Sequence, residues 1–491
     1  MNPYAQLLQG VPFGVAAMGL EEKKGRYAHF SEKYLQVMWW EQKYFKSLST
    51  FSGERIEVVS PGIWNGEAGP DFRKAHVIIG GRELRGDVEI HLVDENWYVH
   101  QHDVDEKYND VVLHLSLWHP RVPKPVHTQA GNEIVRAYFE DALSIPLARI
   151  IQLIDLDLYP YKKFMGSGKC SQQLFRHLAR DEIMRLFASA AAWRLARKYS
   201  YLQARAGESL DLLLAGIAMG LGYKQNAESF LELFKALQAD LGNPAQVFSE
   251  ELLLAKAMGI CGFFSEKFQV KWGTSVHYQR LLGLWKGMAA AVDLRIVLTL
   301  HHIRPFNHPV RRLAFLTKLM VDPKRALFYD SLLATWQAFW PACQAAKKWT
   351  ACRRALEDFF PNYSDPYWNF HYTFAAQPTL QVLSLIGADA KQEIVINTFL
   401  PLLQHHVQHI SQNELEKRAF VDFYASFPAH KTSKTKYLVH RFFGNAPKGN
   451  ILNKAQMEQG AYQLHHDFCV HFEASCEGCP FVERYKEASR I

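Results

Sequence analysis

The amino-acid sequence predicts an α+β fold, in which a mixed or antiparallel sheet module precedes a large and mostly α-helical region. Between residues 51 and 140, short segments rich in Val, Ile and Leu are separated by Gly, Pro and Asp turn signals, a pattern typical of β-strands. From about residue 143 the apolar residues recur at helical spacing almost to the end of the chain. A length of 491 residues also exceeds that of one ordinary domain, so more than one core is expected.

These patterns divide the chain into four predicted segments. Residues 1–30 have weak periodicity and form an N-terminal extension, and residues 31–142 form an α/β core that opens with a helix capped by Ser31. Residues 143–460 form a helical domain, and residues 461–491 form a tail that bears cysteines. Because the strand segments of the core lie close together in the sequence, a mostly antiparallel sheet is the simplest arrangement.

The composition is that of a globular protein with a mild positive charge. Hydrophobic residues make up 48% of the chain and charged residues 21%, and 56 Lys and Arg against 49 Asp and Glu give a net charge of +7. This excess is compatible with a DNA or RNA partner but does not require one. The N-terminal residues lack the pattern of a signal peptide, and the apolar runs are shorter than the roughly 18 residues that span a bilayer. We therefore expect a cytoplasmic protein without a membrane partner, while the oligomeric state stays open.

An acidic pattern in the core predicts a metal-binding active site. Asp71 ends a Gly-Pro turn before one strand, and the next strand places Asp87, Glu89 and His91 on one face, because side chains alternate along a strand. A hairpin through residues 80–86 would bring Asp71 close to Glu89. Two convergent carboxylates suit Mg²⁺ or Mn²⁺, which lowers the pKa of a bound water and offsets charge on a phosphorane-like transition state. The alternative is a solvated strand face without a metal.

Further metal-competent side chains follow the acidic strand. His100 and His102 come soon after it, and His114 lies on or near the next predicted strand. A lone histidine is more often structural, but a cluster this dense is predicted to border the same site. The cluster also supports a different hypothesis, a metallohydrolase that binds zinc or manganese through His91, His100, His102 and His114.

The order of these motifs resembles that of the PD-(D/E)xK nuclease superfamily. The motif G-P-D-F, a spacer and the motif D-V-E-I-H match its pattern of an Asp followed by Glu-x-Lys. The resemblance implies that Asp71 and Glu89 bind the metal and that Glu32 is the glutamate of the preceding helix. It implies a Mg²⁺-dependent nuclease that hydrolyses phosphodiester bonds of DNA or RNA. Because His91 stands where the superfamily has a lysine, a non-catalytic nucleic-acid-binding or scaffold protein with a decayed core is the alternative.

A longer set of motifs resembles an uncharacterised bacterial family that is described only as a domain of unknown function. The motifs run from about residue 31 to residue 482 and include W-N-G-E-A-G-P-D-F, G-D-V-E-I-H, W-Y-V-H-Q-H, Y-N-D-V-V-L-H, R-P-F-N-H-P-V-R-R and C-x-x-C-P-F. This second resemblance implies no established activity.

The cysteines predict a second metal centre. Seven cysteines in a chain without a secretion signal favour metal binding or buried thiols over disulfides. Cys469, Cys476 and Cys479 lie near the C-terminus, and Cys170 or a nearby histidine is the candidate fourth ligand of a [4Fe–4S] cluster or Zn²⁺. This plan resembles that of the iron–sulfur nucleases of bacterial recombination and CRISPR adaptation, in which the lone cysteine instead precedes the nuclease core. The alternative is a set of reduced thiols without a metal.

A polar loop at residues 301–312 predicts contacts with nucleic acid. Two prolines interrupt the helical pattern there, so a loop precedes a new helix. Because arginines beside a helix N-terminus suit phosphate groups, the candidate nucleic-acid-binding residues are Arg304, Asn307, Arg311 and Arg312. The alternative is an inter-helix turn whose arginines bind main-chain carbonyls and pair with acids.

Overall fold

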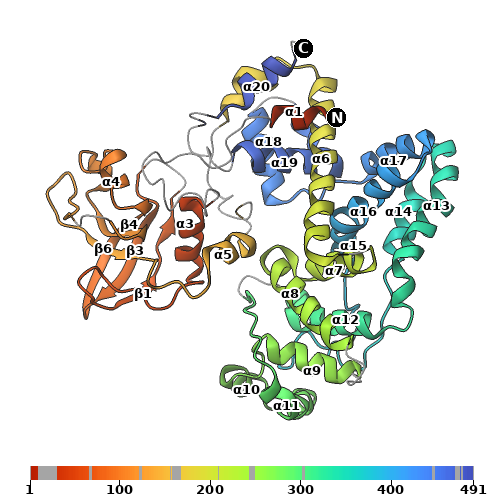
Figure 1. Ribbon diagram of the computed structural model, residues 1–491, viewed down its shortest axis with the longest axis horizontal. Helices are drawn as coiled ribbons and strands as arrows, with labels where there is room; N and C mark the ends of the chain where they lie inside the picture. The colour runs from red at the N-terminus through yellow and green to blue at the C-terminus, as the bar shows by residue number, and fades with distance from the viewer. Residues whose placement is uncertain are drawn as a thin grey trace. The chain divides into compact units, whose positions relative to one another are not determined.

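The chain forms two compact units, neither of which is continuous in sequence. The computed structural model, drawn in Figure 1, describes residues 2–8, 30–65, 69–120, 124–154, 156, 167–207, 209–242, 249–300, 305–444, 448–469, 476 and 479–489. The first unit comprises Met1–Phe187, His430–Leu452 and Ala461–Ile491, and the second comprises Ala188–Ala429 and Asn453–Gly460. The predicted extension, core and cysteine tail therefore contribute to the first unit, and the predicted helical domain contributes to both.

The first unit contains one six-stranded sheet. Its strands are β1 (Ile56–Ser60), β2 (Ile63–Trp64), β3 (Phe72–Ile79), β4 (Arg82–Val93), β5 (Val111–Trp118) and β6 (Val135–Tyr138). The order is β1-β3-β4-β5-β6, and β2 also pairs with β3. Strands β1, β2 and β4 run antiparallel to β3, whereas β4, β5 and β6 are parallel to one another. The predicted α+β class with a mixed sheet is confirmed.

Three of the five strand pairings are antiparallel, as the short connections favour, and the other two are parallel. Between β4 and β5 the chain forms the short helix α4 (Asn96–Val99) and the 3-10 turn η1 (Glu106–Tyr108). This connection is long enough to return the chain and start β5 in the direction of β4, which a tight turn cannot do. The short strands β2 and β6 are additions to the four strands that the sequence predicts.

The hairpin between β3 and β4 positions Asp71. Gly80 and Gly81 form its turn with φ angles of +55° and +84°. Positive φ at both central residues matches the twist of a two-residue hairpin, and glycine adopts it at little cost. Phe72 pairs with Val88 across the hairpin, so Asp71 lies beside Glu89, as the sequence predicts.

Helix α3 (Glu32–Glu41) packs on this sheet, and Figure 1 shows it alongside the strands. Ser31 holds the predicted N-cap position, although its side chain makes no capping hydrogen bond. Leu35 and Trp39 lie one turn apart, are fully buried, and share a core with Val88 of β4. This packing places Glu32, in the first turn of α3, against the end of β4.

The helices of the first unit come from three stretches of sequence. Besides α3, α4 and η1, they are α1 (Pro3–Leu7), α5 (Leu147–Leu153), the π-helical turn η3 (Ser171–Phe175), the start of α6 (Arg180–Ala206), α18 (Ser433–Phe443), most of η9 (Gly449–Asn453), the end of α19 (Ala455–Leu464), the π-helical turn η10 (His465–Cys469) and α20 (Phe481–Ala488). Helix α1 packs against α20, and Tyr4 OH donates to Asp467 Oδ2 (3.1 Å). Both ends of the chain therefore belong to one packed region.

The second unit is helical and has one apolar core. After the rest of α6, a single helix of 27 residues, its elements are α7 (Ser209–Leu221), α8 (Tyr223–Leu241), α9 (Glu250–Ile260), α10 (Glu266–Trp272), α11 (Val276–Met288), η4 (Ala289–Ala291), η5 (Pro305–Asn307), α12 (Pro309–Val321), η6 (Arg325–Leu327), α13 (Phe328–Ala346), α14 (Thr350–Glu357), α15 (Ala388–Ile394), η7 (Val395–Phe399), α16 (Leu400–His405), η8 (His406–Ile410) and α17 (Glu414–Ser426). The predicted break before α12 is confirmed. Within the described ranges, no helix has both the length and the apolar character needed to cross a membrane.

Candidate active site

Three carboxyl groups from separate elements meet at the sheet. Glu32 lies in the first turn of α3, Asp71 directly before β3, and Glu89 in β4. The main-chain N–H of Asp71 donates to Glu89 Oε2 (2.9 Å), and the N–H of Ile90 donates to Asp71 Oδ2 (3.1 Å). The N–H of Leu92 donates to Glu32 Oε1 (3.2 Å). The structure thus brings together the three carboxyl groups that the sequence singles out.

Each of these carboxyl groups has a raised pKa. Burial raises the pKa of Asp71 well above its usual range, and the charges of Glu89 and Glu32 raise it further. Burial, followed by the charge of Glu32, raises the pKa of Glu89 well above its usual range. Burial is also the main cause of the raised pKa of Glu32. A divalent cation would offset the repulsion among the ionised groups, so this set of oxygen donors fits Mg²⁺ or Mn²⁺.

Four histidines continue the site from Glu89. His114 of β5 lies opposite Glu89 in the parallel ladder, and its Nε2 lies 2.8 Å from His91 Nδ1. His91 Nε2 lies 3.2 Å from His100 Nδ1. Glu89 Oε1 lies 3.5 Å from His91 Nε2 and 3.3 Å from His102 Nε2. Glu89 therefore borders the carboxyl groups on one side and the histidines on the other.

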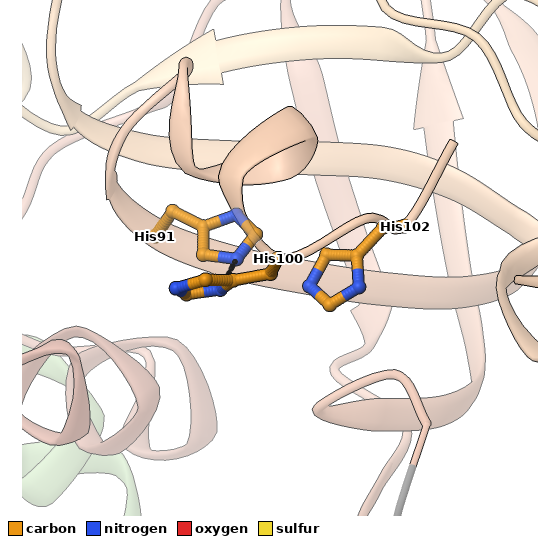
Figure 2. A group of neighbouring side chains, drawn as sticks. All are labelled: His91, His100 and His102. Atoms are coloured by element: carbon orange, nitrogen blue, oxygen red, sulfur yellow. Dashed lines mark hydrogen bonds between the residues drawn. The ribbon is translucent and has the colours of Figure 1, made fainter. Parts of the chain in front are cut away.

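His91, His100 and His102 form a compact group of potential metal ligands. One ring nitrogen of each lies within 4.8 Å of the other two, and Figure 2 shows the three rings side by side with the hydrogen bond between His91 and His100. A search of the described residues for three or more His, Cys, Asp or Glu ligand atoms within 4.8 Å of one another finds this group. His91 and His102 are buried and His100 is exposed, so the group is open to solvent at His100.

Three of the histidines are neutral near pH 7. Burial, together with repulsion from the neighbouring histidines, lowers the pKa of His91 well below its usual value. Burial lowers the pKa of His102 and that of His114 to about 4. A neutral imidazole keeps a lone pair on one nitrogen, which both metal binding and proton acceptance require.

Asp94, directly after β4, lies beside His114. It is buried and accepts hydrogen bonds from Ser116 Oγ (2.8 Å), Arg136 Nη1 (3.1 Å) and Tyr138 OH (2.7 Å). Asp94 Oδ1 also lies 3.7 Å from His114 Nδ1, where its charge favours the tautomer with the proton on Nδ1. With that tautomer, His114 Nε2 accepts from His91 Nδ1–H, and His91 Nε2 accepts from His100 Nδ1–H.

Sequence reasoning misses two side chains of the site. Gln36 Nε2 donates to Asp71 Oδ1 (2.7 Å) and so helps to fix that carboxyl group. The available signal is its spacing of four residues from Glu32, which places both side chains on one face of the helix. Asp94 offers no comparable signal, because an aspartate directly after a strand is also common in ordinary turns.

Asp87 and Tyr108 lie at the edge of the site. Asp87 is half-buried and accepts the main-chain N–H of Lys74 (3.0 Å), and the pairing of β4 with β5 shifts in register directly after it. Tyr108 stacks on His102 with ring centroids 3.8 Å apart. Burial, followed by the charges of Glu89 and Asp71, raises the pKa of Tyr108, so a neutral phenol borders the site.

The four predicted cysteine ligands line one cavity in the first unit. The lining residues are Lys169, Cys170, Phe468, Cys469, Cys476, Cys479, Phe481 and Val482. Burial raises the pKa of Cys170 to about 12 and also raises that of Cys479. The other three cysteines, Cys261, Cys343 and Cys352, lie in the apolar core of the second unit.

The predicted nucleic-acid-binding arginines are buried. Arg311 and Arg312 begin α12, and their exposed fractions are 0% and 1%. Arg311 donates to the main-chain carbonyls of Trp368, His371 and Ser384, and Arg312 Nη2 donates to Asn307 Oδ1 (2.7 Å). These placements follow the structural alternative, in which the arginines bind oxygen atoms of the fold and do not face solvent. Arg304 lies outside the described residues.

Comparison with known proteins places the chain in a family without assigning it an activity. No curated protein matches the sequence, and no solved structure matches the fold. One family model, described as a protein of unknown function (DUF2851), matches residues 32–433. This match spans α3, the whole sheet and most of the helical region, including every residue of the acidic and histidine groups. The chain therefore belongs to the DUF2851 family of proteins of unknown function.

Proposed function

We propose that this chain is a metal-dependent phosphodiester hydrolase that acts on DNA or RNA at Glu32, Asp71 and Glu89. The observation that carries the proposal is the convergence of these three carboxyl groups from a helix, a turn and a strand, each held by a main-chain N–H group. The arrangement resembles the PD-(D/E)xK nucleases, in which a helical glutamate, an aspartate and a strand glutamate surround the metal. The charges of Glu89 and Glu32 raise the pKa of Asp71, and that of Glu32 raises the pKa of Glu89, so a divalent cation among these groups would be favoured over solvent.

The surrounding side chains fit this chemistry. A cation bound by Asp71 and Glu89 would lower the pKa of a bound water and offset charge on the phosphate. His91 stands at the lysine position of the superfamily, and its Nε2 lies 3.5 Å from Glu89 Oε1 and hydrogen-bonds to His100 Nδ1, so it would accept a proton from a bound water in exchange for that hydrogen bond. Arg73 and Lys74 lie two and three residues after Asp71 and are exposed, so they supply positive charge for a phosphate backbone.

The direct test is cleavage of labelled DNA and RNA oligonucleotides, single- and double-stranded, by the purified chain. We expect slow cleavage with Mg²⁺ or Mn²⁺ and none with a chelator. Asp71→Asn should abolish cleavage without unfolding the protein, because it removes a ligand charge and leaves the shape of the side chain. Binding of nucleic acid without cleavage under any of these conditions would contradict the proposal and favour the non-catalytic alternative.

A second candidate function is a metallohydrolase that uses histidines. The observation in its favour is the set of ring nitrogens of His91, His100 and His102, which lie within 4.8 Å of one another. Glu89 Oε1 lies beside two of these rings, so a site with histidine ligands and one carboxylate is available to zinc or manganese. In this candidate the carboxyl groups of Glu32 and Asp71 would lie outside the metal's ligands.

Replacing His91 by Lys separates the two candidates. If His91 holds the lysine position of a nuclease, His91→Lys is expected to preserve or raise Mg²⁺-dependent cleavage, since an ammonium is the group that the superfamily uses there. If His91 is a metal ligand, the same change should weaken zinc binding by about 10-fold or more, together with any hydrolysis. Calorimetric titration with Zn²⁺ and Mg²⁺, combined with the cleavage assay, measures both effects.

Two further variants control for the burial of His91. His100→Gln alters an exposed member of the trio and should leave Mg²⁺-dependent cleavage unchanged. His119→Gln changes an exposed histidine that pairs with Asp141, and it should alter neither metal binding nor cleavage. Loss of Mg²⁺-dependent cleavage in both His91→Lys and His100→Gln, with wild-type behaviour of His119→Gln, would favour the histidine site over the carboxylate site.

A further inference from the structure

Four cysteines that are distant in sequence line one cavity of the first unit. Cys170 lies directly before η3, Cys469 ends η10, and Cys476 and Cys479 precede α20. Cys170, Cys469 and Cys476 are buried, and Cys479 is partly exposed. The cavity also contains the apolar side chains of Phe468, Phe481 and Val482. A cavity lined by sulfur atoms and apolar groups is suited to a soft metal centre and excludes most water.

The groups around Cys476 suit a sulfur that carries negative charge. The main-chain N–H of Lys169 donates to Cys476 Sγ (3.4 Å), and Arg441 Nη2 lies 2.6 Å from the same sulfur. Arg441 is almost fully buried. Cys476 itself has a φ angle of +58°, a conformation uncommon for a side chain other than glycine or asparagine. A strained cysteine that accepts hydrogen bonds from a main-chain amide and a guanidinium is typical of a thiolate ligand and unusual for a protonated thiol that binds no metal.

The spacing of the sulfur atoms favours a cluster over a single ion. Tetrahedral zinc holds four sulfurs at about 2.3 Å from the metal, which places them about 3.8 Å from one another. Among the described residues, no three of the four cysteine sulfurs lie within 4.8 Å of one another, since the histidine trio is the group that meets that spacing. The cysteines therefore line a common cavity, but no three of their sulfurs have the mutual spacing that a single tetrahedral ion requires. A cluster whose thiolates bind different metal atoms needs such a wider arrangement.

We propose that Cys170, Cys469, Cys476 and Cys479 bind a [4Fe–4S] cluster. Each thiol loses its proton and forms one bond to a different iron atom, and the N–H donors of Lys169 and Arg441 reduce the negative charge on Cys476. Because the ligands come from both ends of the first unit, the cluster would tie residues 167–170 to the C-terminal segment. This proposal does not depend on the nuclease proposal, because it concerns different residues and another kind of metal.

The test is metal and sulfide analysis of the full chain purified without oxygen. We expect iron and acid-labile sulfide in equal amounts, about four of each per chain, and a broad visible absorption that dithionite bleaches. Cys479→Ala should lose most of the iron and lower the melting temperature, because the free energy of metal binding contributes to that of folding. The partly exposed position of Cys479 makes this variant less disruptive than a change at a fully buried ligand.

Cys261→Ala is the matched control, since it removes a buried thiol from the core of the second unit. It should keep the full iron and sulfide content, even if it lowers stability. Wild-type protein without iron, or with one zinc and no iron, would overturn the proposed cluster. Equal loss of iron in Cys261→Ala and Cys479→Ala would overturn the ligand assignment. The readout is metal content, so a failure of the nuclease proposal would not change the result.

Discussion

Replacing Glu89 by Gln is expected to lower metal-dependent cleavage by about 100- to 1000-fold, the range seen when one electrostatic group is removed from an active site. Glu89 links the acidic and the histidine groups: it accepts the N–H of Asp71 and lies within 3.5 Å of two histidine nitrogens. Glutamine keeps the size of the side chain but supplies no negative charge for a cation. The measurement is the initial rate of cleavage of a labelled oligonucleotide at saturating Mg²⁺ or Mn²⁺.

The same variant is expected to stabilise the metal-free protein at neutral and higher pH. Because the pKa of Glu89 is raised in the folded state, its protonated form contributes stability that is fully present below the unfolded pKa. That contribution is lost as the pH rises through the folded pKa. A glutamine side chain has no proton to lose, so the melting temperature of the variant in a chelator should exceed that of the wild type increasingly as the pH rises from about 5 to about 8.

The histidines change the stability of the folded protein with pH in the opposite direction to Glu89. The melting temperatures of the wild type and of Glu89→Gln must therefore be compared at each pH. The pKa values of His102 and His114 are lowered to about 4, and their contribution to stability is lost as the pH falls below their usual value of 6.5. Because His102 lies 3.3 Å from Glu89, its effect need not cancel between the wild type and Glu89→Gln, but both histidines lose stability only below their usual pKa of 6.5, so the difference above that pH reports Glu89. An unchanged melting difference across this pH range would contradict the assignment of a raised pKa to Glu89.

Glu83→Gln is the matched control for Glu89→Gln. Glu83 lies on the same strand, but it is exposed and pairs with Arg85 at the hairpin end. The Glu83→Gln variant should leave cleavage, metal binding and the pH dependence of melting unchanged. A similar loss of cleavage in both variants would show that the strand, and not the carboxylate of Glu89, accounts for the effect.

Replacing Arg311 by Ala is expected to destabilise the protein by about 3 to 5 kcal/mol, the scale for removing one partner of a buried charged network. The guanidinium of Arg311 donates to the carbonyls of Trp368, His371 and Ser384, which belong to the irregular segment after α14. Alanine would leave these buried carbonyls without their donor and would open a cavity at the start of α12. Arg311→Lys should recover only part of the loss, because one ammonium cannot match the fixed geometry of a guanidinium.

Thermal melting followed by calorimetry measures this effect. Because the chain has two compact units, the transition of the second unit should shift while that of the first stays in place. Arg280→Ala is the matched control, since Arg280 is 69% exposed and pairs with Glu251, a kind of surface pair that contributes less than about 1 kcal/mol. Wild-type melting of Arg311→Ala, with weakened and less salt-dependent binding of nucleic acid, would instead support the predicted phosphate contact.

The sequence by itself predicts the features of this protein that depend on local patterns. Alternation along β4 and the Gly80-Gly81 turn predict the hairpin that places Asp71 beside Glu89, and both signals act within about ten residues. The apolar spacing predicts the helix that carries Glu32, and the resemblance to the PD-(D/E)xK nucleases implies the role of that glutamate. The spacing of Cys469, Cys476 and Cys479 likewise points to a shared site before any fold is known.

The tertiary structure decides what depends on distant segments. His114 meets His91 only because β5 runs parallel to β4, and the crossover between them makes that direction possible. Arg311 belongs to a helix start that the sequence predicts, yet its burial depends on a segment more than fifty residues later, which no local pattern reports. Periodicity and turn propensity reflect interactions between neighbours in the chain, whereas strand direction and burial are set by packing between segments that meet only after the chain has folded.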